Sequence, residues 1–142
     1  MKVKDAMTHS VIQIRPEENV CVAARILAHY NIGALPVCGK FGQICGMITD
    51  RDIVTRCLAA NRRPETTTVR EIMTSHVLTV APDMELAAAA RMMGRQQVRR
   101  LPVVDQGRLC GVVSLGDIAS NEESGYDAAD ALSEISSNIS QR

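Results

Sequence analysis

The feature that most constrains the fold is an internal repeat that runs through most of the 142 residues. A shift of 66 positions places Val3 on Val69 and Leu35-Pro36-Val37 on Leu101-Pro102-Val103. The shift becomes 65 after a glycine-containing turn, where the loss of one residue disturbs a fold least. A duplication of this kind predicts two copies of one structural unit.

Both copies predict the same order of elements. A β-rich run at 11–14 is stopped by Pro16, which cannot donate a ladder hydrogen bond. Apolar residues at helical spacing follow, and then two apolar runs, 34–37 and 44–48, flank a glycine turn as in a hairpin. A second helix is expected from Asp52 to about residue 60. We therefore expect an α/β fold of two β-α-β-β-α repeats with pseudo-two-fold symmetry and three-stranded sheets.

The repeat borders divide the chain into four parts. Residues 1–61 and 69–120 are the expected domains, and the charged, threonine-rich stretch 62–68 is the linker between them. Residues 121–142 have apolar side chains at helical spacing and predict a short amphipathic helix that caps the module or contacts a partner. A frayed tail is the alternative.

Composition excludes several classes of function. Lys+Arg and Asp+Glu are both 16, whereas proteins that bind nucleic acids or membrane surfaces normally carry a basic excess. No apolar run approaches the ~20 residues of a membrane span, and the first residues lead into no apolar signal region. We therefore expect a cytoplasmic protein with no nucleic-acid or membrane partner. Aromatic residues are only 2% of the chain, so the core must be aliphatic.

Cysteine and histidine give little support to metal or catalytic chemistry. The 5 cysteines are an odd number without a CxxC pair, and the 3 histidines are scattered. The chain has no nucleophile elbow, phosphate-binding P-loop or dinucleotide glycine pattern. We predict no enzyme activity, no catalytic residue and no metal site. A redox or metal sensor built on Cys38 and Cys45, which are joined by a tight turn, is one alternative.

One motif that bears chemistry occurs in both copies, Gly-x-x-Ser/Thr-x-x-Asp. It ends a strand in Thr49 or Ser114 and places Asp52 or Asp117 in the first helical turn. A carboxylate can accept hydrogen bonds from both hydroxyls of a ribose, and a hydroxyl beside free helix N–H groups can hold a phosphate or sugar oxygen. The glycine allows close approach of backbone or ligand. A helix capping box is the structural alternative, but equivalent occurrences in two copies favour a ligand.

On these motifs the chain resembles a tandem pair of CBS domains, the regulatory Bateman module. The matching segments are Ile32–Val37 followed by Gly46–Ile53, and Val98–Val104 followed by Gly111–Ile118. The resemblance extends to about Ser120. It implies two pseudo-symmetric clefts that hold adenosine derivatives such as AMP, ADP, ATP, S-adenosylmethionine or NAD(H), with no further cofactor.

The resemblance also implies which residues form each cleft. In the first, Thr49 and Asp52 would hold the ribose, and an apolar wall would sandwich the adenine. The members expected for the first cleft are Met47, Thr49, Arg51, Asp52, Val98 and Arg99. Those expected for the second are Ile32, Gly33, Ala34, Val112, Ser114 and Asp117.

The two clefts differ in charge. Arg51 and Arg99 belong to the first, whereas Gly116 and Gly33 stand at the equivalent positions of the second. Phosphate oxygens favour guanidinium donors, so the first cleft is expected to be the better nucleotide site. A solvated arginine patch is the alternative.

These inferences predict a ligand-sensing module. Nucleotide binding would shift the relative pose of the repeats, or of two protomers, and a separate effector protein would respond. A homodimer is expected because the helical faces with Val54, Leu58 and Ile118 are too apolar for open solvent. A structural or assembly module without a ligand is the other alternative.

Overall fold

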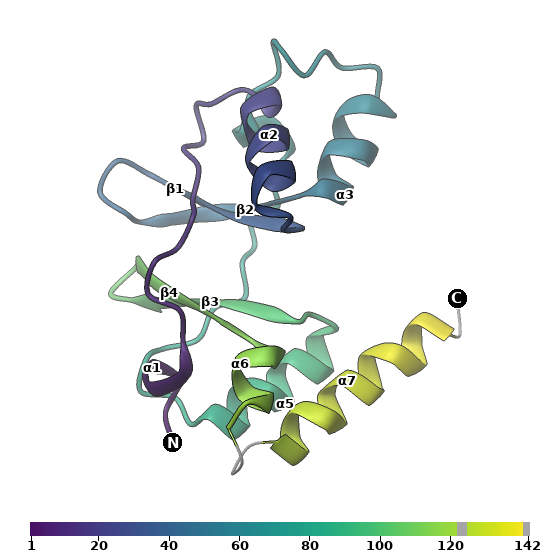
Figure 1. The fold of residues 1–142 in the computed structure, drawn as a ribbon. Helices are drawn as coiled ribbons and strands as arrows, with labels where there is room; N and C mark the ends of the chain where they lie inside the picture. Colours follow the sequence, from purple (N-terminus) through teal and green to yellow (C-terminus); the bar gives the residue numbers. More distant parts are fainter. Residues whose placement is uncertain (122–124, 141–142) are drawn as a thin grey trace. The chain divides into compact units, whose positions relative to one another are not determined.

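The computed structural model describes residues 1–121 and 125–140 and divides the chain into two compact units (Figure 1). The middle unit is Ile12–Val77. The terminal unit joins Met1–Val11 to Leu78–Arg142. Each unit has its own buried cluster of apolar side chains.

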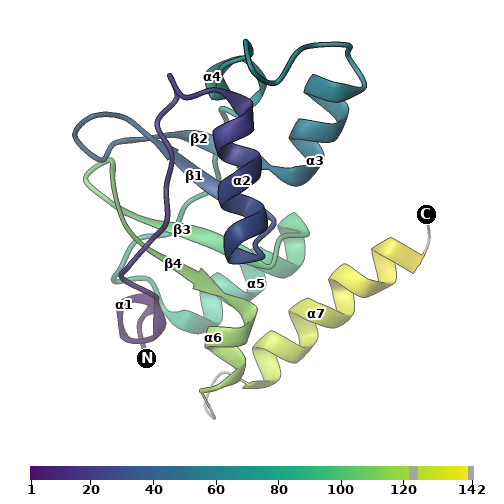
Figure 2. The same cartoon turned by 45° about the horizontal axis from the view of Figure 1, so that its top comes forward.

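The middle unit packs two helices on one face of a hairpin (Figures 1 and 2). Its helix α2 begins after Asn19, whose side chain accepts a hydrogen bond from the Val22 N–H, and it ends at Asn31 in the left-handed conformation. In chain order its elements are α2 (Val20–Tyr30), β1 (Ala34–Cys38), β2 (Ile44–Thr49), α3 (Asp50–Asp52), the π-helix η1 (Ile53–Leu58) and α4 (Val69–Ile72).

The terminal unit repeats this arrangement and adds a helix. Strands β3 and β4 form an antiparallel hairpin, as β1 and β2 do in the middle unit. Its elements are α1 (Val3–Ala6), α5 (Leu86–Gln96), β3 (Arg100–Asp105), β4 (Arg108–Ser114), α6 (Leu115–Ala119) and α7 (Gly125–Ser140). The expected α/β repeats are therefore confirmed in both units.

The expectation of three-stranded sheets was wrong, because each sheet has two strands and the expected first strand is reduced to one isolated bridge. Ile14 forms a single parallel bridge to Val37, and Val80 forms the equivalent bridge to Val103. The Ile14 N–H donates to the Pro36 carbonyl at 3.0 Å, and the Cys38 N–H donates to the Ile14 carbonyl at 2.9 Å. The ladder stops there because Pro16, two residues later, has no N–H to continue it.

The start of each repeat packs on the other repeat. Helix α1 opens the first repeat in the sequence yet lies in the terminal unit, where the Val3 N–H donates to the Met84 carbonyl at 2.9 Å. Helix α4 makes the equivalent contact in the middle unit, where the Val69 N–H donates to the Glu18 carbonyl at 2.8 Å. Val3 and Val69 are both fully buried. The compact units are therefore built by an exchange of the two N-terminal segments.

The cores are aliphatic, as the composition predicts. In the middle unit the buried cluster includes Val20, Leu35 and Ile48, and in the terminal unit it includes Leu86 and Met93. The two described aromatic side chains, Tyr30 and Phe41, are exposed.

The expected C-terminal helix is present as α7, which packs on α5 and α6. Among the side chains of α7 that the structure describes, Ala128, Ala131 and Ile135 are buried. The close approach uses Gly94 of α5, since a Cβ atom there would lie 3.2 Å from the Ala131 Cα atom. Among the described residues, no helix is long and apolar enough to cross a membrane.

Candidate functional site

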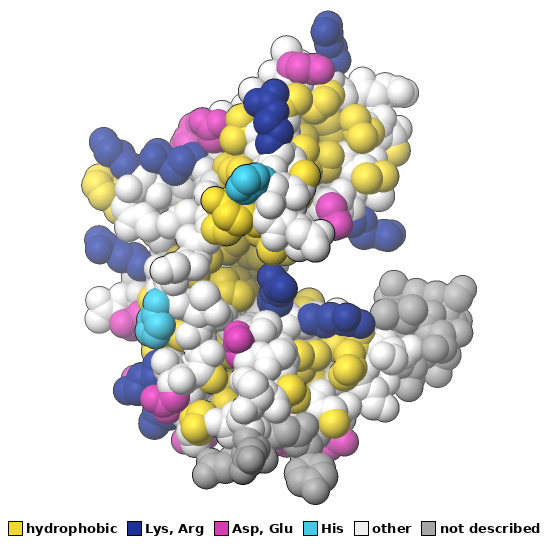
Figure 3. All heavy atoms as spheres, in the orientation of Figure 1, with side chains coloured by type: hydrophobic (Ala, Val, Ile, Leu, Met, Phe, Trp, Pro, Cys, Tyr) yellow, Lys and Arg dark blue, Asp and Glu magenta, His cyan; other side chains and the backbone are white. Residues whose placement is uncertain are grey.

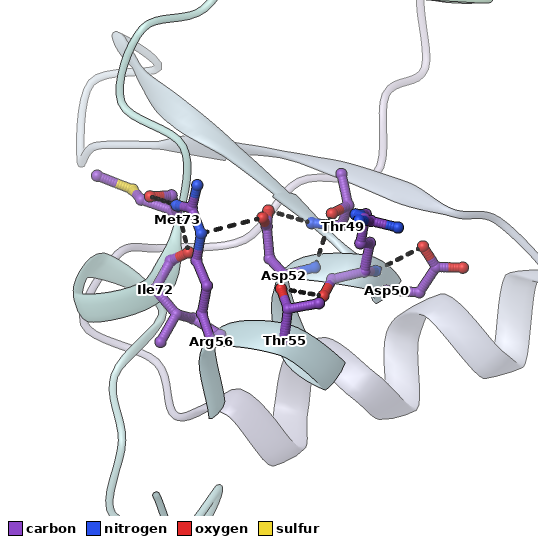
Figure 4. Close-up of polar contacts among 8 residues, drawn as sticks. Thr49, Asp50, Asp52, Thr55, Arg56, Ile72 and Met73 are labelled. Atoms are coloured by element: carbon purple, nitrogen blue, oxygen red, sulfur yellow. Dashed lines mark hydrogen bonds and ion pairs between the residues drawn. The ribbon is translucent and has the colours of Figure 1, made fainter. Parts of the chain in front are cut away.

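The first copy of the shared motif forms a closed pair of hydrogen bonds where β2 meets α3. The Thr49 Oγ1 atom accepts from the Asp52 N–H at 3.0 Å, and the Asp52 Oδ2 atom accepts from the Thr49 N–H at 3.0 Å (Figure 4). Asp52 is only 7% exposed. We call this pair the first capping box.

The second copy has the same geometry where β4 meets α6. The Ser114 Oγ atom accepts from the Asp117 N–H at 3.1 Å, and the Asp117 Oδ2 atom accepts from the Ser114 N–H at 2.9 Å. We call this pair the second capping box. The structural alternative raised by the sequence is thus realised in both units, but it uses only one oxygen of each carboxylate. The Oδ1 atoms keep acceptor capacity that a ribose could use.

Each capping box lies beside a segment that the sequence also predicts to be functional. In the middle unit Ala34 pairs with Thr49, and the Asp50 N–H donates to the Gly33 carbonyl at 3.1 Å. Ile32 precedes these residues and is half-buried. The structure therefore brings residues 32–34 next to the first capping box.

The terminal unit makes the equivalent arrangement. Arg100 pairs with Ser114, and the Leu115 N–H donates to the Arg99 carbonyl at 2.9 Å. Val98 is half-buried and Arg99 is exposed. The crosswise assignment of 98–99 to the first cleft and 32–34 to the second involves both units and stays a prediction.

The apolar candidates are half-buried and the basic candidates are exposed. Met47 and Val112 are half-buried on β2 and β4, one position from the fully buried Ile48 and Val113. Arg51 is exposed in the first turn after the first capping box.

Asp50 is a charged neighbour of the site that the sequence analysis did not include. Its carboxylate lies 3.7 Å from where a Cβ atom of residue 33 would stand, and its Oδ1 atom accepts from the Arg51 N–H at 2.8 Å. The equivalent residue in the terminal unit is Leu115, which is 9% exposed. The alignment of the two repeats could have identified this residue, because Asp50 in the first copy aligns with the aliphatic Leu115 in the second. Asp50 therefore places a negative charge next to Arg51 in the sequence, at the start of α3.

The cysteine alternative has little support from the thiol environment. Cys38 is buried, and burial raises the pKa of its thiol to about 11, with a smaller contribution from Cys45. A thiol with so high a pKa carries little thiolate at neutral pH and reacts slowly. Within residues 1–121 and 125–140, no group of three or more His, Cys, Asp or Glu side chains is placed to hold a metal ion.

The duplicated capping boxes and the duplicated fold agree with a match to known proteins. The family model of the CBS domain matches residues 3–59 and again 69–123. The chain belongs to the CBS-domain family. Each match covers one of the two sequence repeats, so the protein contains a CBS pair.

Several relatives of this CBS pair are known. CBS domain-containing protein YhcV of Bacillus subtilis (strain 168) is 42% identical over 134 residues, which are 94% of each chain. The crystal structure of Hypoxic Response Protein I with two coordinated zinc ions has a TM-score of 0.78 and 36% identity, covering 84% of this chain and 98% of that one. The CBS domain pair of protein MJ0100 in complex with 5-methylthioadenosine and S-adenosyl-L-methionine has a TM-score of 0.73 and 33% identity, with coverages of 84% and 94%.

Proposed function

We propose that this CBS pair is a non-enzymatic regulatory module that binds an adenosine nucleotide. The observation that carries the proposal is the pair of equivalent capping boxes, each of which holds a carboxylate at a strand end with one oxygen uncommitted to the cap. The complex of MJ0100 with two adenosyl compounds supports the ligand class. The arginines of the first cleft favour AMP, ADP, ATP or NAD(H) over S-adenosylmethionine.

The ribose would bind at Asp52, which accepts its hydroxyls, while Thr49 supplies a further polar group. Met47 and Val98 would enclose the adenine, and Arg51 and Arg99 would attract the phosphates. In the second cleft Ser114 and Asp117 would take the ribose, and the base would lie against Val112 and residues 32–34.

Binding would act by changing the pose of the repeats or of two protomers, and a separate effector protein would respond. The size of that change is limited by the difference in ligand affinity between the two states. A homodimer is part of the proposal, because apolar side chains remain exposed on the middle unit. They gather over α2 and η1, in the upper part of Figure 3, and include Tyr30, Val54 and Leu58, which are 51%, 55% and 53% exposed.

A calorimetric screen of AMP, ADP, ATP, NADH and S-adenosylmethionine against the full chain tests the proposal. The variant Asp52→Asn keeps an acceptor for the Thr49 N–H but removes the charge, so the capping box is least disturbed. We expect it to lose most of the affinity of the first cleft, because hydrogen bonds to charged groups contribute about 1.5–3 kcal/mol each. Asp117→Asn is the matched variant and should leave that cleft largely intact.

Two outcomes would contradict the proposal. If none of the five ligands binds, the assembly alternative becomes the better explanation of the fold. If Asp52→Asn lowers the melting temperature and leaves every affinity unchanged, the first capping box serves the helix alone. Zinc-dependent protection of the thiols would favour the sensor based on Cys38 and Cys45.

A further inference from the structure

The Arg56 side chain joins the first capping box to the end of another helix. Its Nε atom lies 3.7 Å from the Asp52 Oδ1 atom. Its Nη1 atom donates to the carbonyl oxygens of Ile72 and Met73, at 3.3 Å each (Figure 4). These carbonyls belong to the C-terminal end of α4, the helix exchanged between the repeats.

The two carboxylate oxygens of Asp52 contact different groups. Oδ2 accepts from the Thr49 N–H inside the capping box, and Oδ1 faces the guanidinium of Arg56. The Asp52 side chain is only 10% exposed, whereas that of Arg56 is 52% exposed. A buried carboxylate needs a compensating charge, and a carboxylate has about four acceptor positions. The positive charge of Arg56 therefore lies at ion-pair distance from Oδ1, and both carboxylate oxygens keep acceptor capacity.

The carbonyls of α4 hold the guanidinium in place. A planar guanidinium carries its donors in a fixed fork, so the two hydrogen bonds to Ile72 and Met73 determine where the Nε atom points. A lysine ammonium, as a single point charge, would lack this orientation.

The second capping box has a different residue at the equivalent position. Four residues after Asp117 the chain carries Asn121, a neutral amide that contacts the sulfur atom of Met1. Among the described residues, no Lys, Arg or His forms an ion pair with Asp117. The two carboxylates are thus equivalent in the cap and different in their electrostatic support.

We infer that Arg56 is a positioning residue that orients Asp52 for the hydroxyls of a ribose and makes the first cleft selective for ribonucleotides over 2′-deoxyribonucleotides. The inference rests on the proposed function, since it concerns the sugar of the nucleotide proposed there. Arg56 would thus determine the selectivity for the sugar by acting through Asp52, without contacting the phosphate.

Titration with AMP and with 2′-deoxy-AMP tests the inference in the full chain carrying Asp117→Asn, which disables the second cleft. The measured quantity is the ratio of the two affinities. Loss of one charge-assisted hydrogen bond lowers an affinity about ten-fold or more. The chain carrying Asp117→Asn, which is the parent of the variants below, should therefore prefer AMP over 2′-deoxy-AMP by that factor. Arg56→Gln should lower the preference several-fold, and Arg56→Lys should restore part of it. Arg51→Gln is the control, since it should weaken both ligands equally and leave the ratio unchanged.

Failure of this inference is distinguishable from failure of the proposed function. A ratio that collapses in Asp52→Asn and stays unchanged in Arg56→Gln overturns the role of Arg56 alone. Equal losses of both affinities in Arg56→Gln also overturn it, because a purely structural role acts on both ligands alike. A parent that binds neither nucleotide, or binds both equally, overturns the ribose assignment of Asp52 and this inference together.

Discussion

The carbonyl oxygen of Thr74 lies 2.6 Å from where a Cβ atom of Gly46 would stand. Thr74 follows α4, and its backbone exchanges two hydrogen bonds with Met47 of β2, of 2.8 and 2.9 Å. In the terminal unit the Thr8 carbonyl lies 2.8 Å from the equivalent position at Gly111. The glycine that opens each Gly-x-x-Ser/Thr-x-x-Asp motif therefore admits the exchanged backbone segment.

Gly46→Ala is expected to destabilise the middle unit by about 1–3 kcal/mol, the usual effect of overpacking a close contact. The added methyl group can be accommodated only if the segment after α4 moves, because its neighbour is backbone. Urea unfolding measures the change. Gly116→Ala is the control, since its Cβ atom would meet only the Ser114 Oγ atom, at 3.6 Å. A gain of up to about 1 kcal/mol is expected there. Equal midpoints for the two variants would contradict this assignment of Gly46.

Sequence patterns predicted the features that depend on local spacing. The capping boxes were the structural alternative to a ligand site, because a hydroxyl residue and an acid three positions later can close a hydrogen-bonded pair at a helix start. Apolar spacing predicted a helix within residues 121–142, and among the described side chains of α7 Ala128, Ala131 and Ile135 are buried.

Contacts between distant parts of the chain were not predictable in the same way. Nothing in the pattern around Val3 says that it packs beside Met84, more than 80 positions away, because each repeat offers an equivalent apolar face. The role of Arg56 depends on the carbonyls of Ile72 and Met73, which carry no side-chain signal. The expectation that Ile118 lies on an open helical face was wrong. Ile118 is fully buried in the terminal unit, whereas Val54 and Leu58 are exposed as expected.

Opposite effects are expected from neutralising the two charges that follow Thr49. If phosphates lie near the first turn of α3, Asp50→Asn should strengthen AMP binding about 2- to 5-fold, and Arg51→Gln should weaken it by a similar factor, the size of an exposed charge interaction. Adenosine is the matched ligand, and its affinity should change little. Added salt should reduce both effects, because the interaction is between charges. Parallel changes for AMP and adenosine would mean that these residues support the base pocket or the fold.

The Cys38 thiol should be slow to react at neutral pH. Burial raises the pKa of the thiol to about 11, so the folded chain keeps a proton that the unfolded chain loses above pH 9. The free energy of unfolding should therefore fall between pH 9 and 11, and Cys38→Ala should reduce that fall.

Alkylation by iodoacetamide, followed residue by residue with mass spectrometry, should modify half-buried Cys21 before Cys38 at pH 8. Rapid modification of Cys38, or a disulfide with Cys45 under mild oxidation, would revive the redox alternative.

The exposed apolar face of the middle unit should mediate self-association. Val54 and Leu58 project from η1 at more than half of their full exposure, and they lie four residues apart on one helical face. The double variant Val54→Ser, Leu58→Ser should shift the chain from dimer to monomer at micromolar concentration, as measured by analytical ultracentrifugation, because burial of two such side chains contributes several kcal/mol in a dimer. Leu132→Ser is the control, since Leu132 is 43% exposed but lies on α7 of the terminal unit. A wild-type chain that is monomeric at this concentration would contradict the homodimer, and dissociation by Leu132→Ser alone would move the interface to α7.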